Sequence, residues 1–201
     1  MSPFRLSVAS IVAAMLVPAG APVIGVAADQ GTSGATSERQ AQDAAFAEFK
    51  KEVDGYIALR RKVTTSVPAL PAQAPPDAVR AHEVALQNLI VGARPVAKEG
   101  EVFVSRVRPL LRGICRQILS GPEGRERLAQ IREEPVQPTL RARVNERYPD
   151  QVPLSAVPYP LLKAFPRLPD ELEYRFLGND LVLLDIHARL IVDVMRDALP
   201  R

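Results

Sequence analysis

Three aspartates and a histidine near the end of the chain have residue types that could bind a divalent metal. Asp185 and His187 are two positions apart, so on a β-strand their side chains would project from one face, about 7 Å apart along it. Asp180 and Asp193 would approach them across neighbouring hairpins, adding carboxylate oxygens to the histidine nitrogen. One histidine with dispersed carboxylates matches no recognised ligand spacing, however. The sequence therefore favours His187 in a tight turn and the aspartates as turn or edge residues, and no metal ligand is predicted.

A cysteine and a histidine form the second candidate pair. A hydrolase needs a nucleophile beside a base, and Cys115 with His82 is the Cys–His pair that the sequence offers. Cys115 lies beside Leu111 and Ile118 at helical spacing, which favours a buried thiol, and as a single cysteine it can form no intramolecular disulfide. His82 is expected on a helix, partly buried.

Other catalytic patterns are missing from the sequence. No serine stands in a Gly-x-Ser-x-Gly elbow, and no spacing singles out a pair of glutamates as a glycosidase acid and nucleophile. The chain has no phosphate loop, dinucleotide fingerprint, CxxC or zinc-protease helix. We therefore predict no catalytic residue and no cofactor, and we lean against an enzyme.

Arginines are the third candidate group. A basic face for anionic lipid, polysaccharide or polyphosphate could be made by Arg106, Arg108, Arg112, Arg116, Arg141, Arg143 and Arg147. A solvated helix face is the ordinary explanation of such a run. The formal net charge of +3 and the absence of Trp give no support to nucleic-acid binding.

The N-terminus predicts export. Arg5 precedes an uncharged run, Pro18 and Gly20 interrupt it, and Val26-Ala27-Ala28 offers the small residues that signal peptidase accepts. We expect cleavage near Ala28 and a periplasmic or secreted product without a stable membrane span. The alternative is an uncleaved N-terminal membrane anchor, since the uncharged stretch is nominally long enough to cross a bilayer.

Helical periodicity predicts the elements that follow. Residues 29–36 read as a flexible leader, and Ser37 with Gln40 predicts a capping box at the start of the first helix. The predicted helices are 37–63, 76–92, 105–119 and 123–133, with a proline-rich connector at 67–76.

The period then changes to that of strands. Alternation predicts a half-buried strand at 139–145, and a proline-rich passage at 149–169 contains one short helical turn at 161–165. The predicted closing strands are 172–177, 181–186 and 190–195, the middle one apolar on both faces and expected to be covered by helices. Their short connectors allow only antiparallel hairpins. The prediction is an α+β fold: a signal peptide (1–28), a leader (29–36) and a helical region (37–134) packed on a three- to four-stranded antiparallel meander (135–201).

The C-terminal part resembles an uncharacterised family of exported bacterial proteins. The likeness is carried by residues 143–155 (RVNERYPDQVPLS) and 172–188 (LEYRFLGNDLVLLDIHA), and more loosely by 94–134. It implies export and no particular activity. The hairpin pattern Tyr-Arg-x-x-Gly-Asn-Asp at 174–180 is also weakly similar to periplasmic nickel/cobalt homeostasis proteins, which implies a metal role for which this chain lacks a His-rich segment.

These observations predict a non-enzymatic binding or interaction protein of the bacterial envelope. Its expected partners are an envelope protein or an anionic envelope polymer, contacted through the helices and proline-rich connectors. The alternative is a periplasmic module that binds a small ligand or a divalent metal through the C-terminal sheet. A hydrolase with an unrecognised site is the third hypothesis.

Overall fold

The computed structural model describes residues 30–133, 141–152 and 157–201. The predicted signal peptide and the first two residues of the strand predicted at 139–145 lie outside these ranges. The helices are α1 (Gln30–Thr64), α2 (Pro76–Ala93), α3 (Val107–Ile118), α4 (Gly121–Glu133) and α5 (Tyr159–Ala164). The four long helices and the short turn of helix are confirmed, close to their predicted bounds except at the beginning of α1.

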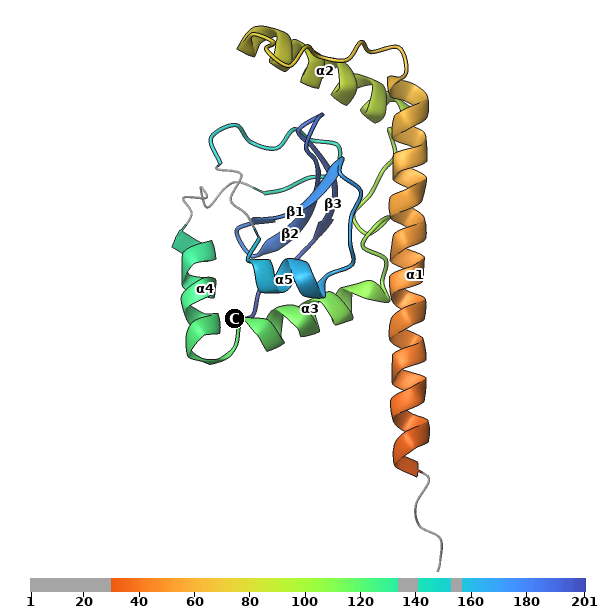
Figure 1. Ribbon diagram of the computed structural model, residues 1–201, viewed down its shortest axis with the longest axis vertical. Helices are drawn as coiled ribbons and strands as arrows, with labels where there is room; N and C mark the ends of the chain where they lie inside the picture. Colours follow the sequence, from red (N-terminus) through yellow and green to blue (C-terminus); the bar gives the residue numbers. More distant parts are fainter. Residues whose placement is uncertain (1–29, 134–140, 153–156) are drawn as a thin grey trace, which may run out of the picture.

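Helix α1 begins earlier than the sequence indicates. It starts at Gln30, so Ser37 lies inside the helix and the predicted capping box is wrong. The residues from 34 to 44 are exposed, and Figure 1 shows this end of α1 projecting away from the rest of the molecule. Burial begins at Ala45 and continues through Phe49, Val53 and Tyr56, where apolar side chains recur on one helix face.

Three antiparallel strands form the sheet, in the order β1-β2-β3. They are β1 (Leu172–Leu177), β2 (Asp180–Asp185) and β3 (Leu190–Met195), as predicted except that β2 lies one residue earlier. Gly178 joins β1 to β2 with a φ of 60°, a conformation that glycine adopts without strain. Between β2 and β3 the register shifts by one residue after Leu183, which pairs with Asp193. The α+β fold with an antiparallel meander is confirmed.

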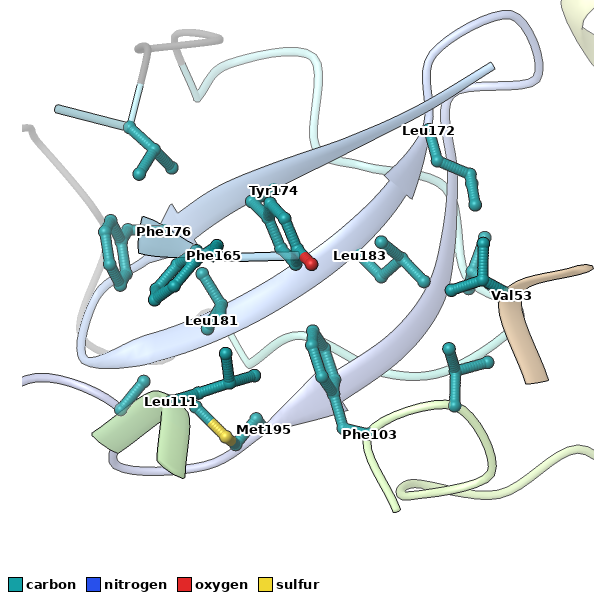
Figure 2. Packing of buried hydrophobic residues seen from close by; sticks show 14 of the residues in the cluster. Val53, Phe103, Leu111, Phe165, Leu172, Tyr174, Phe176, Leu181, Leu183 and Met195 are labelled. Carbon is teal, nitrogen blue, oxygen red and sulfur yellow. The ribbon is translucent and has the colours of Figure 1, made fainter. Parts of the chain in front are cut away.

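One face of the sheet and the helices share a single core. Figure 2 shows Tyr174, Leu183 and Met195 of the sheet facing Val53 of α1 and Phe103 of the loop before α3. Phe49, Phe103 and Tyr174 stack with ring centroids 5.9 to 6.5 Å apart. The helical region and the sheet are therefore held together by shared burial.

The other face of the sheet is covered by an irregular segment instead of helices. Ala142, Tyr148 and Val152 are buried against Val182 and Leu184 of β2. The described part of the strand predicted at 139–145 is not a strand: the chain pairs only briefly with β3, through an isolated bridge between Arg147 and Leu190. The alternating apolar residues of this segment pack on the sheet, and Asn145 turns the chain with a φ of 64°.

Candidate functional site

Asp185 is an internal anchor of the fold. Its side chain is fully buried and accepts hydrogen bonds from Tyr56 Oη at 2.9 Å and from Arg60 Nε at 2.6 Å. Its other oxygen accepts from the backbone N–H groups of His187 (3.1 Å) and Ala188 (3.0 Å). Four donors satisfy a buried carboxylate, so Asp185 joins α1 to the β2–β3 turn. His187 lies in that turn with an exposed side chain, as the sequence favours, and the two side chains do not form a metal pair.

Asp193 is a second buried anchor, on β3. Its oxygens lie 2.7 Å from each of four backbone nitrogens, those of Gly100, Val102, Phe103 and Val194. Burial raises the pKa of Asp193 above its ordinary value, while the four N–H donors act in the opposite direction. The carboxylate fixes the loop before α3 to the sheet.

Asp180 makes a third, separate set of contacts. It accepts from Arg196 Nη1 at 2.6 Å and from the backbone N–H of Asp197 at 3.0 Å. The three aspartates thus bind different parts of the chain, and the structure does not bring them together. Across the described residues there is no group of three or more His, Cys, Asp or Glu side chains that could hold a metal ion.

Cys115 and His82 are also apart. Cys115 is fully buried on α3 within the shared core, and burial raises the pKa of its thiol to about 12. This confirms the buried thiol that its neighbours predict. His82 is partly buried on α2 and lines a cleft to which Cys115 does not contribute.

That cleft gathers both histidines of the chain. It has a volume of about 480 Å³ and lies between the end of α1, the proline-rich connector, α2 and the β2–β3 turn. Figure 1 shows α2 crossing the end of α1 and lying over one end of the sheet. We call this cleft the histidine cleft. Its lining residues are Arg60, Thr64, Val67, Ala69, Leu70, Val79, His82, Glu83, Leu86, Ile186 and His187.

The walls of the histidine cleft differ in chemistry. Val67, Leu70 and Leu86 supply apolar surface, while Arg60, largely buried, is oriented by Asp185. Glu83 is paired with Arg147 outside the cleft, and hydrogen bonds to Glu83 and Asp150 outweigh burial and raise the pKa of Arg147. The cleft therefore combines an apolar wall, two imidazoles and a fixed guanidinium, with its one acidic side chain already paired.

The predicted basic face is divided among several sites. Arg108 donates to the carbonyl of Phe103, Arg147 pairs with Glu83, and Arg143 lies 3.5 Å from Glu146. Arg112 and Arg116 remain together and are joined by arginines from α4 and from the end of the chain. The predicted basic face is therefore not formed as one surface, and a different group of arginines, from α3, α4 and the end of the chain, lies together instead.

The histidine cleft was missed from the sequence because its walls come from two segments, 60–86 and 186–187, that lie about a hundred residues apart. Two local signals pointed to the buried charges of the fold, only the first of which borders the cleft. Arg60 continues the buried face of α1 four residues after Tyr56, and Asp193 interrupts an otherwise apolar strand. A charged residue at a core position needs a buried partner.

No family model matches the chain, and comparison with curated proteins and with solved structures gives no match.

Proposed function

We propose that this chain is an exported, non-enzymatic binding protein of the bacterial envelope, and that it holds its ligand in the histidine cleft. The observation that carries the proposal is the meeting of His82, His187 and Arg60 at one apolar-walled cleft of about 480 Å³. Ligand sites are concave, mostly apolar and furnished with a few convergent polar groups, and this volume lies within their usual range. The proline-rich connector forms one wall, which supports a role for this connector in contact with a ligand.

Binding is favoured over catalysis because neither the buried Asp185 carboxylate nor the Cys115 thiol is available to act with the two imidazoles. Asp185 is saturated by four donors and cannot act as a base without losing the anchor of α1. The Cys115 thiol, with a pKa of about 12, stays protonated in the core. The side chains left for a ligand are the two imidazoles and the outward part of the Arg60 guanidinium.

The chemistry of the walls favours a small amphipathic ligand with a negative charge. Arg60 and the imidazoles supply donors for a carboxylate or a similar anion. Val67, Leu70 and Leu86 supply surface for an apolar portion. A short segment of an envelope protein that carries an acidic residue has the same features.

The cleft is tested by histidine-resolved NMR. The imidazole signals are assigned with His82→Gln and His187→Gln and followed while the low-molecular-weight fraction of an envelope extract is added. We expect both signals to shift and the backbone signal of Asn88, exposed on α2, to stay in place. Shifts elsewhere with both imidazoles unmoved would reject the cleft as the site.

Export rests on the residues before Gln30. None of the helices in the described part of the chain has the length and apolar character needed to cross a membrane. Cell fractionation with N-terminal sequencing tests the proposal: a periplasmic or secreted product that begins at Asp29 is expected. A full-length product that fractionates with membranes would favour the anchor instead.

A divalent-metal site is the second candidate, favoured by the two histidines at one cleft. Two imidazoles would need further donors from water or from a bound molecule, because Glu83 is paired with Arg147. Calorimetry with nickel, cobalt, zinc and calcium decides between the candidates. Tight binding that His82→Ala abolishes would support the metal, and no heat at millimolar metal would exclude it.

A further inference from the structure

Two adjoining hollows at the end of the chain are lined by arginines from three separate segments. The larger, of about 680 Å³, contains Arg125 and Arg132 of α4, and the smaller, of about 320 Å³, contains Arg112 and Arg116 of α3. Arg132, Pro200 and Arg201 line both. We call the two together the basic hollow.

Charge in the basic hollow is strongly one-sided. Among the lining residues, the only acidic side chain facing the five guanidinium groups is that of Asp197. With five guanidinium groups against one side-chain carboxylate, positive charge is in excess. Like charges held around one concavity focus a positive potential and raise the local concentration of anions.

Some of these arginines are held in place and others are free to bind. Arg112 donates to the carbonyls of Arg196 (2.7 Å) and Asp197 (3.2 Å), and Arg132 donates to that of Pro200 at 2.6 Å. These bonds orient the side chains without neutralising their charge. Arg116, Arg125 and Arg201 form no ion pair with any other residue that the structure describes.

We propose that the basic hollow is a binding site for a soluble ligand that carries several phosphate groups. The planar guanidinium fork matches phosphate oxygens with paired hydrogen bonds, which suits a cluster of arginines to this ligand. A membrane surface fits less well. The large hydrophobic residues exposed in the described structure are Val84, Leu89, Val96, Tyr159 and Leu162, and none of them lines the basic hollow to insert into lipid. This site is separate from the histidine cleft.

Calorimetry with inorganic tripolyphosphate at low salt tests the proposal on the exported protein. The double variant Arg116→Gln, Arg125→Gln removes two exposed arginines that have no ion pair within the described residues, so the fold should be retained, which circular dichroism checks. The matched control is Arg106→Gln, Arg143→Gln, whose side chains are 72% and 71% exposed and lie outside the hollow. We expect at least a tenfold loss of affinity in the first variant and less than a twofold loss in the control.

Salt dependence supplies a second readout. Affinity for tripolyphosphate should fall as the salt concentration rises, and it should fall less steeply in the variant that lacks two of the arginines. The proposal fails if the wild type gives no heat with millimolar tripolyphosphate, or if both double variants weaken binding equally. It also fails if polyglutamate binds as tightly, or if phosphatidylglycerol vesicles bind and tripolyphosphate does not.

Discussion

Replacing Asp193 with Asn should strongly destabilise the fold, although the two side chains have nearly the same shape. The carboxylate accepts four backbone N–H bonds, two at each oxygen, and all four distances are 2.7 Å. In Asn one oxygen becomes an NH₂ group, which donates and cannot accept. Whichever way the amide points, two backbone N–H groups would face another donor.

The magnitude follows from the two lost bonds. A hydrogen bond to a charged group contributes about 1.5 to 3 kcal/mol, so two of them amount to about 3 to 6 kcal/mol. The neutral amide is less costly to bury than a carboxylate, which offsets part of this loss. We therefore expect Asp193→Asn to lower the free energy of unfolding by about 3 kcal/mol.

Urea unfolding followed by circular dichroism measures the effect. The matched control is Asp197→Asn, because Asp197 is exposed and sits at a φ of 49° that Asn tolerates. The control should change stability by no more than about 0.5 kcal/mol. Equal stability of Asp193→Asn and the wild type would refute the idea that this carboxylate anchors the loop before α3.

Three further predictions concern other parts of the fold. Tyr56→Phe should cost about 1 to 3 kcal/mol in urea unfolding because the Asp185 carboxylate loses a buried donor; an unchanged midpoint would contradict this. The pKa of the Cys115 thiol is about 12 in the folded state and near 8.5 in the unfolded state, so the fold favours the protonated thiol. The stability that this preference contributes is complete below about pH 8.5 and is lost as the pH rises toward 12. The stability of the wild type should fall relative to Cys115→Ala by about 1.4 kcal/mol per pH unit above 8.5, and parallel pH profiles would contradict the burial. Gly178→Ala should cost about 1 kcal/mol because of the φ of 60°, again by urea unfolding, and a neutral result would show that the turn relaxes.

Local periodicity was sufficient to predict most helices and all three strands of the sheet. The runs at 172–177 and 190–195 are short, apolar and separated by turns, and strands form there because few other arrangements bury them. The beginning of α1 was harder to predict. Residues 30–36 are rich in Gly, Ser and Thr, which disfavour a helix locally, and the helix nevertheless begins at Gln30.

The alternation of apolar and polar residues at 139–145 led to the wrong prediction of a strand. Ala142 and Val144 alternate with polar residues as in a strand, but the segment packs on the face of the sheet instead of extending its edge. A sequence shows which side chains will be buried more readily than it shows whether the main chain will pair. The same limit applies to the aspartates: Asp193 accepts from Gly100 and Val102, which lie 93 and 91 residues away in the chain.

The histidine cleft and the basic hollow both depend on tertiary packing, which the sequence alone does not predict. His82 and His187 meet because α2 lies over one end of the sheet. Arg116 and Arg125 line adjoining hollows because α3 and α4 border the same end of the chain. In both cases the residue types were visible in the sequence, and the grouping came from the fold.

Native mass spectrometry of the protein isolated from the envelope fraction tests the central proposal most directly. We expect the wild type to carry a bound small molecule, the double variant His82→Ala, His187→Ala to lose it, and the control Asn88→Ala on the same helix to keep it. A wild-type mass equal to that of the chain alone, or the same adduct on all three proteins, would contradict the histidine cleft as the ligand site.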